Sequence, residues 1–438
     1  MNKFIESTRR KVFWTLDAIK GGKVKSHYNE VKFIMENFSS EKSKNLRFQN
    51  LDKLLVHATK TCDFYQRFSD FNSIEDFPII NKSLIRNQYQ EFRSDAFGEY
   101  DCYEMSTSGS SGTPFKTLQN RNKRLRNTAD TIYFKQKAGF EIGSRLYYIR
   151  KWFKMHTRSW LTTMTRNIVM VNVTEFTDEY LDNFIQQLEH DQSTQVIISY
   201  SSALRELCNY LDKISSPPIK NNLSCIVAMA EDLSNQTRES LKKYFDTPVL
   251  LRYSNLENGI LSLQLDDNNE NLQINCASYH IEILHLDKDE PVEEGEMGRI
   301  VITDLFNYAM PFIRYDTGDL GVMTNTDKYF KGSPAFTKVQ GRKMDAIFDT
   351  NGKIQSTFIV FYLEEYSDIK QFQFIQNGRR EYELKLNVEK GFNKQNQLIE
   401  LFRSYLGKDA EIKISYVDEI PQLSSGKRRL TVNNFIQS

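Results

Sequence analysis

Apolar strands and amphipathic helices alternate between residues 167 and 253, and this alternation constrains the fold of the chain most strongly. Four short apolar runs have the length and composition of buried strands, and they lie at 167–173, 195–200, 223–230 and 248–253. Between them, residues 179–190 and 204–211 repeat their apolar positions at helical spacing, and Ser234 stands where a third helix would begin. This order predicts a parallel sheet that is covered by helices.

The sequence on either side of this region follows other patterns. Roughly the first hundred residues read mainly as helices, with apolar residues at helical spacing between 51 and 58. Residues 259–304 form short alternating runs separated by Asp, Asn and Gly, which predicts a β-rich subdomain.

A third pattern follows Arg342. Asn377-Gly378 lies between two apolar runs and signals a hairpin, a helical face closes at Gly407, and a last strand is expected at 411–417. A chain of 438 residues also exceeds what one core usually holds. We therefore expect an α/β protein with a large domain at 1–342 and a small α+β domain at 343–438.

Composition excludes several classes of protein. The chain is 39% hydrophobic and 26% charged, as globular proteins are, and its 58 Lys and Arg nearly balance its 57 Asp and Glu. A balanced charge gives no overall attraction to nucleic acid. No apolar run is long enough to span a membrane, and the N-terminal residues lack the apolar stretch of a signal peptide. We expect a cytoplasmic protein with no nucleic-acid partner and no membrane span.

Cysteine and histidine do not form a recognisable metal or disulfide pattern. The five cysteines are scattered without a CxxC pair, which fits a reducing compartment. His280, Glu282 and His285 lie close together, but strand periodicity would turn His285 to the opposite face. We expect these three to be ordinary strand positions.

The segment from Met105 to Lys116 carries the strongest chemical signal. It is rich in Gly, Ser and Thr, so it offers many backbone N–H groups and hydroxyls with little bulk, as wrapping around a polyphosphate requires. It is not a Walker loop. A flexible linker is the alternative, but Pro114 and Lys116 fix its end. The candidate phosphate-binding residues are Ser106, Thr107, Ser108, Gly109, Ser110, Ser111, Gly112, Thr113 and Lys116.

Three further motifs follow in order. Arg314-Tyr-Asp-Thr-Gly-Asp319 presents a carboxylate on a tight turn, where it could accept both hydroxyls of a ribose, or could simply be an Asp-rich turn. Gly341-Arg342-Lys-Met-Asp345 stands where the composition changes and could be a solvated linker. Ser425-Gly-Lys427 places a lysine beyond a small flexible turn and could be a solvated tail.

Taken together and in this order, the motifs resemble those of the adenylate-forming superfamily of acyl-CoA ligases, luciferases and peptide-synthetase adenylation domains. Tyr253-Ser-Asn-Leu-Glu257 is similar to the family's Tyr-Gly-x-Thr-Glu element, with Ser254 and Leu256 departing from it. The residue sequences of the Ser/Thr/Gly loop and of Gly21-Gly22-Lys-Val-Lys resemble those of a narrower group, the phenylacetate–CoA-ligase-like branch. Within that branch they resemble the CapK group of capsular-polysaccharide biosynthesis.

This resemblance implies roles for individual residues. The loop at 106–116 would hold the β- and γ-phosphates of ATP, and Glu257 would help to place Mg²⁺. Tyr253 would stack near the adenine. Asp319 would accept the ribose hydroxyls, with Arg342 close to the ribose and the α-phosphate.

The small domain would be a mobile lid that carries a catalytic lysine. Lys427 would reach in to bridge the attacking carboxylate and ATP, and residues 342–345 would form the hinge. The family often has an acidic residue or a Lys where this chain has Met344. Tyr200 and Ala230 are candidates for pocket lining.

The implied activity is an AMP-forming ligase that converts a carboxylate and ATP, with Mg²⁺, into an acyl-adenylate. The acyl group would pass to CoA or to an amine such as an amino sugar, in capsular polysaccharide synthesis. A carboxylate is already ionised at pH 7, so no general base is required. The alternatives are a catabolic aryl- or acyl-CoA ligase, an amide ligase or adenylyl transferase that does not use CoA, and a non-catalytic nucleotide-binding module. The last is disfavoured because Asp319, Arg342 and Lys427 are all present.

Overall fold

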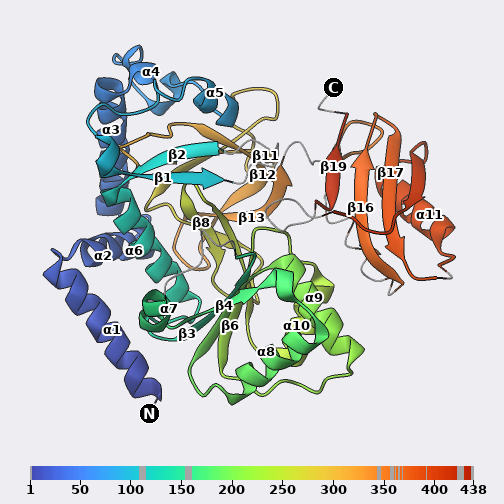
Figure 1. Cartoon of the computed structure of the whole chain (residues 1–438). Helices are drawn as coiled ribbons and strands as arrows, with labels where there is room; N and C mark the ends of the chain where they lie inside the picture. The colour runs from blue at the N-terminus through green and yellow to red at the C-terminus, as the bar shows by residue number, and fades with distance from the viewer. Residues whose placement is uncertain are drawn as a thin grey trace.

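The computed structural model describes residues 2–107, 115–152, 160–342, 347–355, 360, 362–363, 366, 368–390, 392–421 and 429–435. Three parts follow along the chain in Figure 1: N-terminal helices, a large mixed sheet with its helices, and a small C-terminal domain with its own sheet. The described helices are α1 (Asn2–Ile19), α2 (Lys23–Glu36), α3 (Glu41–Thr61), α4 (Asp63–Gln66), α5 (Lys82–Asn87), α6 (Arg121–Lys137), α7 (Trp160–Arg166), α8 (Asp178–His190), α9 (Ser201–Lys213), α10 (Asn235–Phe245) and α11 (Gln395–Leu406).

The large sheet has eleven strands in the order β10-β11-β12-β13-β9-β8-β7-β6-β5-β3-β4. Its parallel half comprises β3 (Arg145–Arg150), β4 (Ile168–Asn172), β5 (Gln195–Tyr200), β6 (Leu223–Met229) and β7 (Val249–Asn255). Its antiparallel half comprises β8 (Gly259–Gln264), β9 (Leu272–Ile274), β10 (Tyr279–Leu284), β11 (Met297–Asp304), β12 (Tyr315–Thr326) and β13 (Ser333–Arg342). The predicted helix-covered parallel sheet and the predicted β-rich region are both confirmed, and β7 joins them into one sheet.

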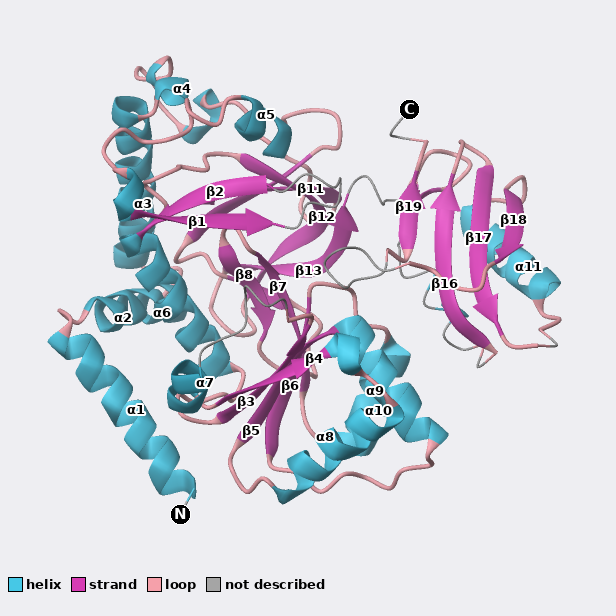
Figure 2. Cartoon of the chain, viewed as in Figure 1, coloured by secondary structure: helices cyan, strands magenta, loops and turns pink. Residues whose placement is uncertain are grey.

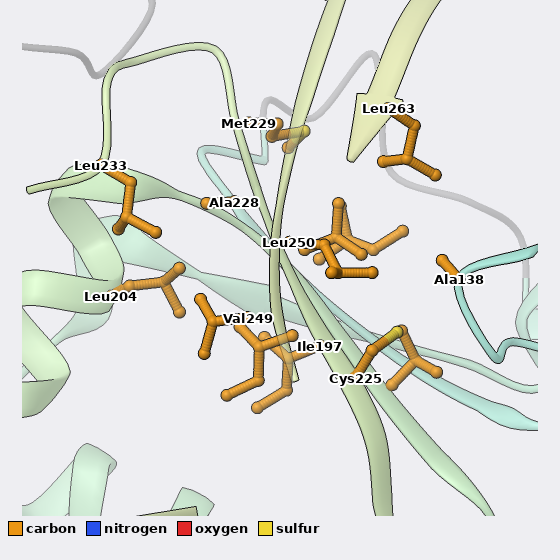
Figure 3. Packing of buried hydrophobic residues seen from close by; sticks show 14 of the residues in the cluster. Ala138, Ile197, Leu204, Cys225, Ala228, Met229, Leu233, Val249, Leu250 and Leu263 are labelled. Carbon is orange, nitrogen blue, oxygen red and sulfur yellow. The ribbon is translucent and has the colours of Figure 1, made fainter. Parts of the chain in front are cut away.

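Helices cover both faces of the parallel half, as Figure 2 shows. The ring of Tyr147 on β3 contacts Phe184 of α8, so α8 covers one face. On that side Leu204 of α9 and Leu233 pack against the strands, and Ala138, just beyond α6, packs from the other (Figure 3). Ser234 caps α10 by accepting a hydrogen bond from the Thr237 N–H at 3.1 Å, as predicted.

The N-terminal helices support the middle of the sheet through a second apolar cluster. Phe64, Tyr65 and Phe77 pack there with Phe312 and Tyr315, which precede or begin β12. Ile80 forms a parallel bridge with Tyr315, so the chain before α5 runs beside β12. The predicted helical start of the chain is confirmed, and it brings α5 next to the sheet.

The C-terminal domain contains a four-stranded sheet in the order β18-β17-β16-β19, packed against α11. Its strands are β16 (Ile369–Gln376), β17 (Glu381–Val388), β18 (Glu411–Tyr416) and β19 (Thr431–Asn433), and the short pair β14 (Ile347–Phe348) and β15 (Ile354–Gln355) precedes them. The predicted hairpin is present, with residues 377–380 as its connection, and Gly407 closes α11 at a φ of 122°. The expected domain boundary, between residues 342 and 343, falls where the described part of the chain stops before residues 343–346.

Candidate active site

A two-stranded hairpin carries the stem of the Ser/Thr/Gly loop. Strands β1 (Cys102–Thr107) and β2 (Phe115–Asn120) pair antiparallel, with Thr107 opposite Phe115 and Ser106 opposite Lys116. The Lys116 Nζ lies 3.0 Å from Glu104, and both side chains are more than half exposed. The predicted phosphate-binding residues Ser108, Gly109, Ser110, Ser111, Gly112 and Thr113 fall outside the described residues.

Tyr253 and Asp319 meet across the sheet. The Tyr253 hydroxyl on β7 donates to Asp319 Oδ2 on β12 at 2.7 Å. Burial and the Asp319 carboxylate raise the pKa of Tyr253 well above its usual value, so the phenol stays protonated and donates. Gly318 precedes Asp319 with a φ of 82°, the tight turn that the motif predicts.

Glu257 is buried and held by two side chains. It is 2% exposed, and its Oε1 lies 2.9 Å from Lys82 Nζ on α5 and accepts a hydrogen bond from the Tyr315 hydroxyl at 2.9 Å. Burial and the Glu257 charge raise the pKa of Tyr315 well above its usual value, so Tyr315 also remains a donor. The Gln119 amide donates to the Glu257 backbone carbonyl at 2.8 Å, which ties this residue to the β1–β2 stem.

Sequence reasoning gave no role to Lys82 and Tyr315. Tyr315 lies inside the Arg314–Asp319 motif, and its aromatic hydroxyl next to two carboxylates was the available signal. Lys82 follows Asn81, which caps α5 by accepting from the Leu84 N–H, and nothing in the local sequence connects it with Glu257. The bridge between Ile80 and Tyr315 is what brings it there.

Arg314 begins the same motif but has a structural role. Its backbone is left-handed, with a φ of 50°, and its guanidinium donates to the Glu282 carboxylate at 2.9 Å and to the Phe77 carbonyl at 3.0 Å. Glu282 is thereby engaged in an ion pair. Among the described residues no group of His, Cys, Asp and Glu is arranged to hold a metal ion by itself. His280 and Glu282 lie in β10, and His285 follows the last residue of that strand.

The remaining predicted residues are placed only in part. The backbone of Arg342 lies directly opposite Asp319 in the β12–β13 register, so the two share one end of the sheet. The side chain of Arg342, the hinge at 343–346 and Lys427 lie outside the described residues. Tyr200 ends β5 and is buried, and Ala230 follows β6 with a left-handed φ of 69°.

Comparison with known proteins identifies the C-terminal part of the chain. Residues 347–434 match the family described as the CapK C-terminal domain. This part of the chain is therefore similar to the CapK C-terminal domain. The chain is also 24% identical over 314 residues to a phenylacetate–coenzyme A ligase of Thermus thermophilus, covering 66% of this chain and 68% of that protein. The resemblance inferred from the motifs is therefore confirmed.

Solved structures show which fold the chain has. A 2-hydroxyisobutyryl-CoA ligase in its postadenylation state, in complex with an acyl-AMP, superposes with a TM-score of 0.72 at 14% identity over 91% of each chain. The same ligase in its thioesterification state gives 0.60 at 15% identity over 92% of each chain. ATP-bound MatB from Rhodopseudomonas palustris gives 0.55 at 14% identity, over 77% of this chain and 68% of its own. The chain has the acyl-CoA ligase fold.

Cysteine pairing and the apolarity of the helices are two further features of the described residues. No disulfide joins any two of the five cysteines, all of which lie in the described part of the chain. In the described residues, no helix combines the length and the hydropathy that crossing a bilayer demands.

Proposed function

We propose that this protein is an AMP-forming ligase that joins a carboxylic acid to the AMP part of ATP and then transfers the acyl group to an acceptor. The observation that carries the proposal is the convergence of Tyr253, Glu257 and Asp319 at the sheet, beside the stem of the Ser/Thr/Gly loop. These are the residues to which the resemblance assigns adenine, metal and ribose, and the acyl-CoA ligase fold supports the assignment.

Asp319 would accept the ribose hydroxyls, and Tyr253 would hold its carboxylate in place. One carboxylate oxygen already receives the Tyr253 hydroxyl at 2.7 Å, which restricts how the group can rotate. A fixed, ionised acceptor forms stronger hydrogen bonds than a neutral one. The Tyr253 ring packs edge-to-face against Phe336, and their ring centres are 5.9 Å apart. An adenine bound here would pack against aromatic side chains.

Glu257 fits a role in placing Mg²⁺. Magnesium in nucleotide enzymes is commonly bound by one or two carboxylates together with substrate phosphates, and Glu257 supplies one such carboxylate. When bound, Mg²⁺ would neutralise phosphate charge. Lys82 and Tyr315 keep the Glu257 carboxylate oriented through contacts of 2.9 Å each.

The transition state of the first half-reaction would be stabilised mainly by positive charge. A carboxylate that attacks the α-phosphorus brings two anions together, and pyrophosphate leaves as acyl-AMP forms. Arg342 would stabilise that charge from β13, and Lys427 would do so from the C-terminal domain. The second half-reaction would require Lys427 to withdraw, which explains why it belongs to a separate domain hinged near residues 342–345.

The acceptor would be CoA or an amine such as an amino sugar, and the process would be surface-polysaccharide synthesis in the cytoplasm. The match to the CapK C-terminal domain supports this assignment. A catabolic aryl- or acyl-CoA ligase is the second candidate, and the similarity to a phenylacetate–coenzyme A ligase favours it.

Pyrophosphate exchange into ATP tests the proposal. The enzyme would be screened with Mg²⁺ against a library of carboxylic and amino acids, with and without CoA. We expect exchange with one chemical class of acid and loss of exchange in Asp319→Ala. A protein that raises its melting temperature with ATP but supports exchange with no acid would instead be a nucleotide-binding module.

A further inference from the structure

Helix α1 has two apolar faces, and the fold buries one of them. The rings of Phe13 and Trp14 pack into a small cluster with Val24 of α2 and with Ala129 and Ile132 of α6. Five other apolar side chains of α1 are 40% to 76% exposed and form its exposed apolar face; they are Phe4, Ile5, Val12, Leu16 and Ile19. At about 100° of rotation per residue, these five side chains share about 120° of the helix surface. Figure 1 shows α1 at the edge of the molecule, so this face is open to an external partner.

The exposed apolar face borders a groove that lies between α1, α6 and α7. The groove has a volume of about 1030 Å³. Its apolar lining includes Phe4, Ile5, Val12, Phe13, Leu16 and Leu125. Five cationic side chains also line it; they are Arg9, Lys20, Lys23, Arg121 and Arg166. The acidic side chain among its described lining residues is Asp17, which accepts the backbone N–H groups of Val24 at 3.1 Å and Lys25 at 2.9 Å. The groove therefore combines an apolar wall with a net positive charge.

Positive charge is concentrated in the same segment of the sequence. Residues 1–25 contain seven Lys and Arg and two acidic residues, which gives them a net charge of +5. The whole chain carries +1, so the other 413 residues together carry −4. Gly21 and Gly22, with φ values of 96° and 66°, form the turn that returns the start of α2 to the end of α1. There Lys25 Nζ lies 4.5 Å from the ring centre of Trp14.

An apolar face bordered by cations is complementary to the surface of an anionic bilayer. Amphipathic helices of this kind lie in the plane of the membrane surface, with their apolar side chains at the acyl chains and their cations at the phosphate groups. Anionic lipids attract clusters of Lys and Arg near the surface. A second copy of the chain is a poorer match, because a two-fold interface would place one +5 segment against an identical one.

We propose that α1 docks this protein on the surface of a bilayer that contains anionic phospholipid. Phe4, Ile5 and Ile19 enter the layer between the headgroups and the acyl chains, and Lys20, Lys23 and the other cations of the groove bind headgroup phosphates. The negative remainder of the chain then faces away from the membrane. This inference goes beyond the proposed ligase function and does not depend on it.

Co-sedimentation with vesicles tests the proposal. The full chain is mixed with vesicles of phosphatidylcholine, or of phosphatidylcholine with about 30% phosphatidylglycerol, at about 0.1 M salt. We expect the partition coefficient for the anionic vesicles to be at least about tenfold higher. It should fall as the salt concentration rises, because salt screens surface charge. Equal partition into both kinds of vesicle, or binding to neither, would overturn the proposal.

An apolar double variant tests the exposed face of α1. Phe4→Gln/Ile19→Gln removes two side chains that are each 76% exposed, and it should lower partition into the anionic vesicles about tenfold or more. The matched control is Phe48→Gln/Ile214→Gln, which removes exposed apolar side chains from α3 and from the end of α9. This control should bind as the wild type does. Equal losses in the two double variants would show that α1 is not the docking helix.

A charge double variant tests the cations. Lys20→Gln/Lys23→Gln should lower partition into the anionic vesicles about tenfold or more. Lys328→Gln/Lys390→Gln makes the same change in net charge at two exposed positions elsewhere and should have little effect. All of these variants should keep the melting temperature of the wild type, because the replaced side chains are exposed. Equal losses in the two charge variants would assign the attraction to net charge and overturn the role of α1.

Light scattering without lipid distinguishes a bilayer from a second copy as the occupant of this face. We expect the wild type and Phe4→Gln/Ile19→Gln to have the same mass in solution. A wild-type oligomer that this variant dissociates would assign the exposed apolar face to a second copy and overturn the proposal.

Discussion

The Tyr253 hydroxyl donates to Asp319 at 2.7 Å, and the relationship is reciprocal: the Tyr315 hydroxyl, four residues before Asp319, donates to Glu257, four residues after Tyr253, at 2.9 Å. Residues 253–257 and 315–319 are far apart in the sequence, and each segment supplies one tyrosine hydroxyl and one carboxylate. Each hydroxyl donates to the carboxylate of the other segment. Both phenols remain protonated because burial and the nearby carboxylates raise their pKa values. The two carboxylates that the proposed function requires are fixed by the same pair of contacts.

Replacing Asp319 should weaken ATP binding. In Asp319→Ala the loss of a pair of charge-assisted hydrogen bonds to the ribose should cost about 2–4 kcal/mol of ATP affinity, since each such bond contributes about 1.5–3 kcal/mol. Calorimetry with ATP and with the acid substrate would show a loss for ATP and little change for the acid. Tyr253→Phe keeps the carboxylate and should lose less than Asp319→Ala. Unchanged ATP affinity in Asp319→Ala would remove Asp319 from the ribose site.

Replacing Lys82 should strengthen Mg²⁺ binding and lower the stability of the fold. The Glu257 side chain is 2% exposed and that of Lys82 is 32% exposed. Among the described residues, Lys82→Met therefore leaves the buried Glu257 carboxylate with Tyr315 as its one side-chain donor. The free energy of unfolding should fall by about 1–3 kcal/mol. Lys82→Met also removes a cation that competes with Mg²⁺ for the Glu257 carboxylate. A lower Mg²⁺ concentration should therefore give half-maximal ATP binding.

Urea unfolding and a Mg²⁺ titration of ATP binding measure these two effects. Lys44→Met is the matched control, because Lys44 pairs with Glu41 on the surface with 54% of its side chain exposed. Its effect on stability should stay within about 1 kcal/mol. A Lys82→Met protein that needs more Mg²⁺ than the wild type would contradict the assignment of Glu257.

The sequence predicts the parallel half of the fold well because the relevant information is local. The run at 195–200 coincides with β5, and Ser234 caps α10 as its position indicates. Strand β3 was missed, since an arginine at each end and polar hydroxyls between them obscure its apolar pattern. The order of the eleven strands was not predicted either, because it depends on pairing between distant segments.

The candidate site was predictable only where the motifs carry it. Tyr253, Glu257 and Asp319 were named from their motifs, and the structure brings them together. The position of Lys82 next to Glu257 depends on the bridge between Ile80 and Tyr315, a long-range contact that no local sequence pattern predicts.

Under the proposed function, Lys427 should act in one half-reaction only. Lys427→Ala is expected to lower the rate of adenylation by about 10²–10³, the usual effect of removing one electrostatic contact to a transition state. Transfer from a pre-formed acyl-AMP should remain largely intact, because Lys427 would have withdrawn by then. Single-turnover rates of both steps provide the measurement. Equal losses in both would contradict a two-position mechanism.

Asp191 should make the stability of the sheet depend on acid pH. Its carboxylate accepts hydrogen bonds from the Ser193 N–H and the Tyr147 hydroxyl, each at 2.9 Å. Burial alone would raise the pKa of Asp191, but these donors and Arg145 lower it below its usual value. A lowered pKa stabilises the fold above that value and ceases to do so as the pH falls through the folded pKa.

Asp191→Asn should therefore lower the free energy of unfolding at pH 7 by about 1–3 kcal/mol. The difference from the wild type should narrow below about pH 4. Urea unfolding at several pH values from 7 to 3 measures it, with Asp178→Asn as the control because the Asp178 side chain is 66% exposed. A difference that stays constant over this range would show that Asp191 stabilises the fold by other means.

Oxygen transfer from the acid to AMP tests the central claim most directly. The acid found by the exchange screen would be labelled with ¹⁸O in both carboxylate oxygens and incubated with the protein, ATP, Mg²⁺ and the acceptor. Attack of that carboxylate on the α-phosphorus places one of its oxygens between carbon and phosphorus, and acyl transfer then leaves this oxygen on AMP. We predict AMP that carries one ¹⁸O, in amounts equal to the acyl product. Unlabelled AMP, or ADP and phosphate in its place, would contradict an acyl-adenylate intermediate.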